Sequence, residues 1–157
     1  MLQALLGPLT ILALVAELQT PVPRVPWAWP IQPGIVVERF DRPEQPWSAG
    51  HRGIDLAASP GMAVAAPTGA TVRFAGAVVD RGVLSLTLGN GMILTLEPVR
   101  TQLRIGDAVA AGDAIGVVDV GGHCADHCLH LGLIDHEQYV SPLPWFLPRA
   151  RLLPARR

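Results

Sequence analysis

The stretch Gly50-His51-Arg52-Gly53-Ile54-Asp55-Leu56 places an imidazole and a carboxylate four residues apart. A second imidazole, His130, lies far downstream in Leu129-His130-Leu131-Gly132-Leu133. Two nitrogens and one oxygen suit zinc, and three protein ligands leave a fourth tetrahedral position open, as in catalytic zinc sites. His51, Asp55 and His130 could converge on a metal ion only if the chain folds back on itself, and the spacing alone favours a surface pair. In such a pair, His51 and Asp55 hydrogen-bond each other without a metal.

The composition favours one small domain that is rich in β-structure. A chain of 157 residues fits a single domain with a substantial core. Half of the residues are hydrophobic but only 5% are aromatic, and the 16 glycines and 15 prolines favour short strands and turns over long helices. The formal net charge of -1 argues against general nucleic-acid binding, and no nucleic-acid-binding motif is present.

The pattern from residue 35 to residue 140 predicts short strands separated by turns. Residues 35–40 read as a first strand, and a loop over 41–49 leads to His51. Further strands are expected at 62–66, 70–79, 82–88, 92–98, 108–109 and 114–120. No sustained helical periodicity interrupts them, so we expect an all-β, mostly antiparallel sandwich or open barrel.

One expected hairpin shows this pattern clearly. Leu84, Leu86 and Leu88 alternate with smaller or polar residues and share one face, which we predict to be the buried one. The Gly89-Asn90-Gly91 turn that follows suits the positive φ angles of a tight hairpin.

The two ends of the chain differ from the middle. Residues 1–19 are predicted to be a signal peptide, because the uncharged apolar run over 1–16 is shorter than the roughly 20 residues that a membrane span needs. The basic residue expected before that run is missing, so an N-terminal anchor in contact with the membrane is the alternative. Residues 20–33 form a proline-rich linker whose two tryptophans are expected to pack on the domain, and 144–157 form a basic tail.

The motif around His51 also carries a family resemblance. Residues 51–56, followed by 60–66, resemble the signature of LytM and lysostaphin-type zinc metallopeptidases, which cut peptide bridges in peptidoglycan. The similarity continues through 69–72, 106–116 and 129–133, in the family's order, and covers 34–143. It implies a duplicated hybrid (barrel-sandwich) fold and an exported, extracytoplasmic metalloendopeptidase that uses Zn²⁺. The zinc ligands implied are His51, Asp55 and His130.

Two further histidines of that family are replaced in this chain. Cys128 and Pro98 stand at their positions, so the residue that transfers the proton is not identified by the resemblance. Glu97 is one candidate, although it is expected to face away from the cleft because neighbouring strand residues alternate. His127 is the other, if the loop over 121–126 turns its side chain inward. His123 and His136 are expected to be surface residues.

The two cysteines, Cys124 and Cys128, bracket a short turn. In an exported protein this spacing predicts a disulfide that closes a small loop. One alternative makes the Cys128 thiolate a fourth zinc ligand, which would close the site to chemistry. Another is a structural zinc knuckle over 123–128.

Two functions follow from these expectations. The first is hydrolysis of peptidoglycan cross-bridges by a metal-activated water. The second is a catalytically degenerate LytM-like domain that binds wall peptides or regulates another murein hydrolase through protein contact, and the replaced histidines favour it. A β-domain without metal remains the third alternative. None of these involves nucleic acid.

Overall fold

The computed structural model describes residues 25–45, 47–123 and 125–148. The predicted targeting segment, the first part of the linker and the end of the basic tail therefore lie outside the described residues. Within the described ranges, no helix combines the length and the apolar character that crossing a membrane requires.

The chain forms short antiparallel strands and one short helix within the described residues, so the predicted all-β fold is confirmed. The strands are β1 (Val36–Glu38), β2 (Gly53–Ala57), β3 (Ala63–Ala65), β4 (Ala70–Val78), β5 (Arg81–Leu88), β6 (Ile93–Glu97), β7 (Val99–Arg100), β8 (Ala108–Val109), β9 (Ala114–Val118), β10 (Cys128–Asp135) and β11 (Gln138–Val140), and the helix is α1 (Leu143–Phe146).

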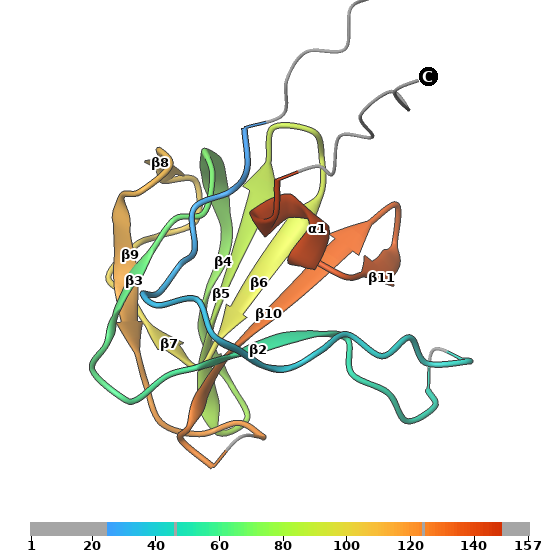
Figure 1. Cartoon of the computed structure of the whole chain (residues 1–157). Helices are drawn as coiled ribbons and strands as arrows, with labels where there is room; N and C mark the ends of the chain where they lie inside the picture. The colour runs from blue at the N-terminus through green and yellow to red at the C-terminus, as the bar shows by residue number, and fades with distance from the viewer. Residues whose placement is uncertain (1–24, 46, 124, 149–157) are drawn as a thin grey trace, which may run out of the picture.

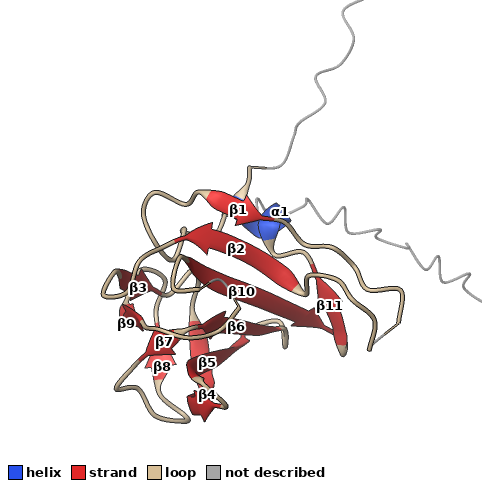
Figure 2. Ribbon diagram, turned by 90° about the horizontal axis from the view of Figure 1, so that it is seen from below, coloured by secondary structure: helices blue, strands red, loops and turns tan. Residues whose placement is uncertain are grey.

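The strands form two sheets. The larger has the order β1-β2-β10-β6-β5-β4-β8, with β11 paired to β10, and the smaller has the order β3-β9-β7. Figure 1 shows the smaller sheet beside the larger one, and Figure 2 shows β2 and β10 lying next to each other. Strand β10, from the end of the domain, is thus inserted between β2 and β6, and this brings the two distant sequence motifs together.

The buried face of the larger sheet is built from leucines. As predicted, Leu84, Leu86 and Leu88 on β5 point into the core, and at most 5% of each is exposed. Leu86 faces Leu94 of β6 across the sheet, and Leu94 faces Leu133 of β10. Burying each such side chain contributes about 1.5–3 kcal/mol, so this row holds β10 firmly in place.

The described part of the linker packs on the domain through its tryptophans, as expected. Trp29 stacks on Phe146 of α1 with ring centroids 4.4 Å apart, and Trp27 contacts the same ring edge-on at 5.6 Å. The Trp27 amide also donates a hydrogen bond of 2.8 Å to the Trp145 carbonyl. These contacts fasten the described start of the chain to its described end.

Candidate metal centre

Strands β2 and β10 bring the two distant motifs side by side. Asp55 and His130 are directly opposite residues of this antiparallel pair, and such residues project to the same face of a sheet. His51 lies just before β2 and is held by a backbone bridge to Asp41. The structure therefore gathers the three side chains that the sequence proposed as metal ligands.

Three ligand atoms of this cluster form a small triangle. Asp55 Oδ1 lies 2.7 Å from His130 Nδ1 and 3.1 Å from His51 Nε2, and the two imidazole nitrogens are 3.1 Å apart. Ligands of a tetrahedral zinc with bonds of about 2.0–2.1 Å are separated by about 3.3–3.4 Å. The triangle thus needs to expand only slightly to surround such an ion.

The hydrogen-bonding capacity of these atoms also fits a cation. His51 Nδ1 donates to the Arg39 carbonyl at 2.8 Å, which leaves a lone pair on Nε2 when the ring is neutral. The Asp55 carboxylate only accepts hydrogen bonds. With both imidazole rings neutral, the three atoms of the triangle can therefore share only one hydrogen, carried by His130 Nδ1. A metal ion would satisfy all three atoms at once. The bond to Arg39 is the kind of outer contact that orients metal-binding histidines.

Asp55 is the buried, charged centre of the cluster, with only 1% of the residue exposed. Burial by itself raises the pKa of this carboxyl. Hydrogen bonds with His130 and His123, together with the charges of His130 and His51, outweigh burial and bring the pKa below the ordinary value of 3.8. Asp55 is therefore a carboxylate at neutral pH, as a zinc ligand must be.

His123 is a member of this cluster that sequence reasoning missed. Its Nε2 lies 2.9 Å from Asp55 Oδ2. One possible ligand atom from each of His51, Asp55, His123 and His130 lies within 4.8 Å of the other three. The side chain is 47% exposed, so it lies at the surface as expected, but its contact with Asp55 was not expected from the sequence. The two glycines before it were the available signal, because they allow the loop to turn inward.

Glu97 lies on the same face as the cluster, and the expectation that it faces away is wrong. It is the cross-strand partner of His130 on β6, so Asp55, His130 and Glu97 form one row across three strands. Its carboxylate pairs with Arg81, with 3.0 Å between Oε1 and Nε. The alternation of strand faces was counted from Pro98, which lies just outside β6. Glu97 itself is the residue of β6 that pairs with His130, so it shares the face of His130.

The other two histidines lie apart from the metal-binding group. His127 is exposed, and its carbonyl accepts a hydrogen bond of 3.1 Å from the Ala58 amide. Its proposed part in proton transfer remains a prediction. His136 is exposed and contacts Asp135 at 2.8 Å, as expected of a surface residue.

The sulfur of Cys128 is not available to a metal. Cys128 is buried and disulfide-bonded, which agrees with the predicted disulfide, and Cys124 lies outside the described residues. A disulfide sulfur is not a thiolate, and zinc binds the thiolate. The alternatives in which Cys128 is a fourth ligand or part of a zinc knuckle are therefore wrong.

The loop that carries His123 rests on the turn between β4 and β5. Gly121 has a φ of 102° and comes so close to this turn that a methyl group on it would lie 2.4 Å from the Asp80 carbonyl oxygen. Gly122 lies over the side chain of Arg81. The Gly121 amide also donates a hydrogen bond of 2.7 Å to Asp126 Oδ1, which closes the loop on itself.

Gly121→Ala is expected to lower the free energy of unfolding by about 2–4 kcal/mol, because it adds a backbone clash to the strain of a positive φ. Urea unfolding measures this change. Gly112→Ala is the matched control, since Gly112 has a φ of 87° but open space around it, and it should cost only about 1–2 kcal/mol. Equal losses in the two variants would contradict the close contact with Asp80.

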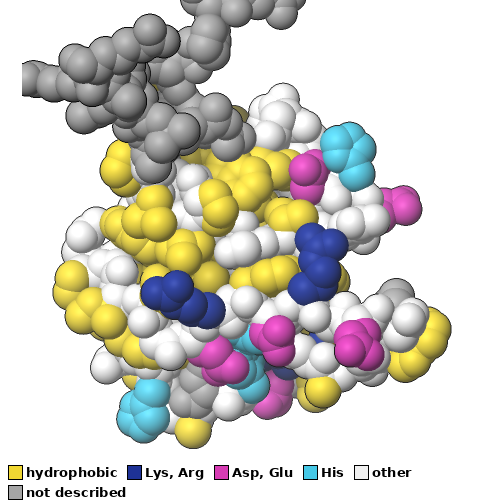
Figure 3. All heavy atoms as spheres, turned by 45° about the vertical axis from the view of Figure 1, so that its right-hand side comes forward, with side chains coloured by type: hydrophobic (Ala, Val, Ile, Leu, Met, Phe, Trp, Pro, Cys, Tyr) yellow, Lys and Arg dark blue, Asp and Glu magenta, His cyan; other side chains and the backbone are white. Residues whose placement is uncertain are grey.

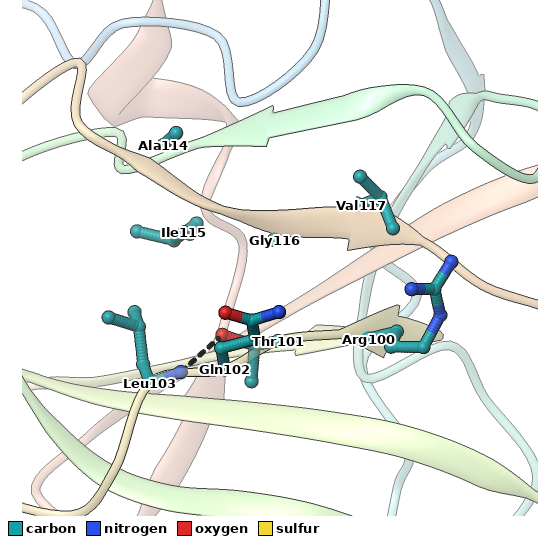
Figure 4. Close-up of a pocket in the computed structure, with 8 residues that line it drawn as sticks. All are labelled: Arg100, Thr101, Gln102, Leu103, Ala114, Ile115, Gly116 and Val117. Carbon is teal, nitrogen blue, oxygen red and sulfur yellow. Dashed lines mark hydrogen bonds between the residues drawn. The ribbon is translucent and has the colours of Figure 1, made fainter.

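The structure also contains a cavity of about 290 Å³ on the smaller sheet (Figure 4). It lies between Arg100–Leu103 and Ala114–Val117. The dashed line in Figure 4 marks the hydrogen bond of 3.1 Å that the Leu103 amide donates to Thr101 Oγ1. None of the four cluster residues lines it, so this cavity is separate from the candidate metal centre.

Comparison with known proteins assigns the domain. Residues 49–142 match the model of peptidase family M23. A protein of Mycobacterium tuberculosis named "Uncharacterized protein Rv2891" is 42% identical over 122 residues, which cover 73% of this chain and 49% of the relative. The chain therefore aligns with about half the length of this relative.

Solved structures of low sequence identity share the fold. The catalytic domain of the antimicrobial peptidase lysostaphin from Staphylococcus simulans has a TM-score of 0.62 at 19% identity, over 72% of this chain and 92% of that chain. A zinc-containing peptidase from Vibrio cholerae has a TM-score of 0.66 at 15% identity, over 83% and 41%.

Proposed function

The chain belongs to peptidase family M23, and from this premise we propose that it is a zinc metalloendopeptidase that cleaves peptide cross-bridges of peptidoglycan. The observation that carries the proposal is the triangle of His51 Nε2, Asp55 Oδ1 and His130 Nδ1, with sides of 2.7–3.1 Å. Family membership alone would not distinguish a metal-binding member from one that has lost its ligands.

In this proposal the three residues hold the ion and the sheet fixes their positions. When bound by these residues, zinc would act as a Lewis acid that polarises the peptide carbonyl and would lower the pKa of a water molecule toward neutral pH. Hydrolysis joins the water oxygen to the carbonyl carbon, breaks the C–N bond and delivers one proton to the leaving amine. His51 and His130 offer nitrogen lone pairs, and Asp55 offers the negative charge that offsets part of the ion's charge.

Glu97 is the better placed of the two predicted proton carriers. It stands beside His130 on the same face, is 15% exposed, and is held by Arg81. The side chain of His127 is exposed, and His127 is not one of the four clustered residues. We propose Glu97 for this role, in which a carboxylate accepts a proton from water and returns it to the amine.

Family membership supports a proposed substrate and location. A peptidase that acts on peptidoglycan must work outside the cytoplasm, and the apolar start of the sequence suits export. Peptidoglycan peptides are accordingly the proposed partners.

A second candidate function is a binding module that keeps the metal or the cleft but no longer cuts. Pro98 and a disulfide-bonded Cys128 stand where the resembled family carries histidines, and this favours it. Such a module would recognise wall peptides or regulate another hydrolase.

Digestion of purified muropeptides separates the two functions. The zinc-loaded protein is expected to release new amino termini, to lose this activity in a chelator, and to regain it when zinc is restored. Mass spectrometry of the products then identifies the bond. Peptide binding by the zinc-loaded protein without any cleavage would replace the peptidase with the binding module.

A further inference from the structure

We propose that His123 is a positioning residue of the metal centre: its Nε2–H holds the outer oxygen of Asp55, so that Oδ1 alone faces the metal. The inference rests on the metal site of the proposed function, but not on its substrate or its chemistry. It assigns a role to a loop residue that lies outside the motifs carrying the family resemblance.

The contacts of the carboxylate carry the first step. A carboxylate can bind a metal through one oxygen or through both. Asp55 Oδ1 contacts His51 and His130, whereas Oδ2 lies 2.9 Å from His123 Nε2. Since the carboxylate only accepts, the hydrogen of this bond is on His123. The bond therefore fixes which oxygen is turned toward the two metal-binding nitrogens.

The burial of Asp55 makes its hydrogen bond with His123 important for the site. Asp55 is 1% exposed, so bulk water cannot easily replace a lost hydrogen-bond donor. Losing a hydrogen-bond donor to a buried charged oxygen is costly, because the oxygen keeps its charge while its stabilisation is reduced. Losing His123 would therefore loosen the orientation of the Asp55 carboxylate, and Oδ1 would be held less well for metal binding.

The loop is built to present His123 at this point. Gly121 and Gly122 pack against the carbonyl of Asp80 and the side chain of Arg81, and β10 begins at the disulfide-bonded Cys128. The side chain of His123 is 47% exposed, against 11% for His51 and 12% for His130. In the space-filling view, histidine and acidic side chains lie beside one another at the surface (Figure 3).

The same geometry distinguishes positioning from direct ligation. The triangle atoms all lie within 3.1 Å of one another, and the short contact of His123 is with the oxygen outside this triangle. A glutamine at this position can test the difference, because its amide nitrogen reaches about as far as Nε2 of histidine and donates a similar bond. An asparagine is too short to do so.

The test is a chelator competition that measures the zinc affinity of the full chain and its variants. His123→Ala and His123→Asn are expected to bind zinc about 10–100-fold more weakly, the usual effect of losing an outer hydrogen bond to a metal ligand. His123→Gln should recover most of the affinity. His136→Ala, which removes an exposed histidine outside the cluster, should match the parent. The visible absorption of the Co²⁺-loaded proteins should show the same coordination number throughout.

Each contrary result has a distinct meaning. Parent affinity in His123→Ala would overturn the inference. A changed coordination number in His123→Ala, with no rescue by glutamine, would make His123 a direct ligand and would also overturn it. If the parent cleaves no muropeptide but the affinities follow the expected order, the proposed function falls and the inference stands. If the parent protein binds no zinc, both the proposed function and the inference about His123 are wrong.

Discussion

Asp55→Asn is expected to weaken zinc binding by about a thousand-fold and to abolish zinc-dependent peptide cleavage. The substitution keeps the shape of the side chain but removes its negative charge and replaces one acceptor oxygen with an amide group. Removing one member of a buried charged group costs about 3–5 kcal/mol, which corresponds to a factor of about 10²–10⁴ in affinity. Zinc affinity by chelator competition and metal content after gel filtration measure the effect.

The control for this prediction is Asp135→Asn, on the same strand as His130. Asp135 also contacts a histidine, His136, but its side chain is 40% exposed. Exposed ion pairs contribute little to stability, so this variant should bind zinc and cleave peptides as the parent does. A parent-like zinc affinity in Asp55→Asn would show that Asp55 is not a ligand, and the metal centre would have to be built from other residues.

The sequence predicted the fold class and three of the four clustered residues because these depend on local patterns. Alternation in the strands identified the buried leucines of β5. The motif around His51 pointed to Asp55 directly, and His130 followed from the family resemblance. In the folded chain β10 lies between β2 and β6, and this brings the motifs into contact.

Positions that depend on contacts between distant segments were missed. The loop of His123 is set by the turn at Asp80, about forty residues earlier, and no local pattern encodes that contact. Glu97 was misplaced for a related reason, since its direction depends on the register between β6 and β10. In both cases side chains were oriented by neighbours that are far away in the sequence.

Gly53→Ala is expected to lower the free energy of unfolding by about 3 kcal/mol or more and to disrupt zinc binding at the same time. A methyl group on Gly53 would lie 2.1 Å from the Leu131 carbonyl oxygen and 2.7 Å from the ring of His130. The carbonyl belongs to the backbone of β10, so relief requires the two strands to separate. Overpacking of this kind typically costs 1–3 kcal/mol and sometimes more. Urea unfolding and zinc affinity measure the two effects.

Gly132→Ala is the natural control, because Gly132 faces Gly53 directly across the strand pair. A methyl group there would meet its nearest neighbour, the Arg52 carbonyl oxygen, at 3.6 Å, which is an ordinary contact. The two paired glycines are thus expected to tolerate alanine very differently. Gly132→Ala should change the free energy of unfolding by less than about 1 kcal/mol and leave the zinc affinity unchanged. If both variants behave alike, strand pairing alone sets the tolerance of this region. If only Gly53→Ala loses zinc, the glycine of the His51 motif is required because the ring of His130 lies against it.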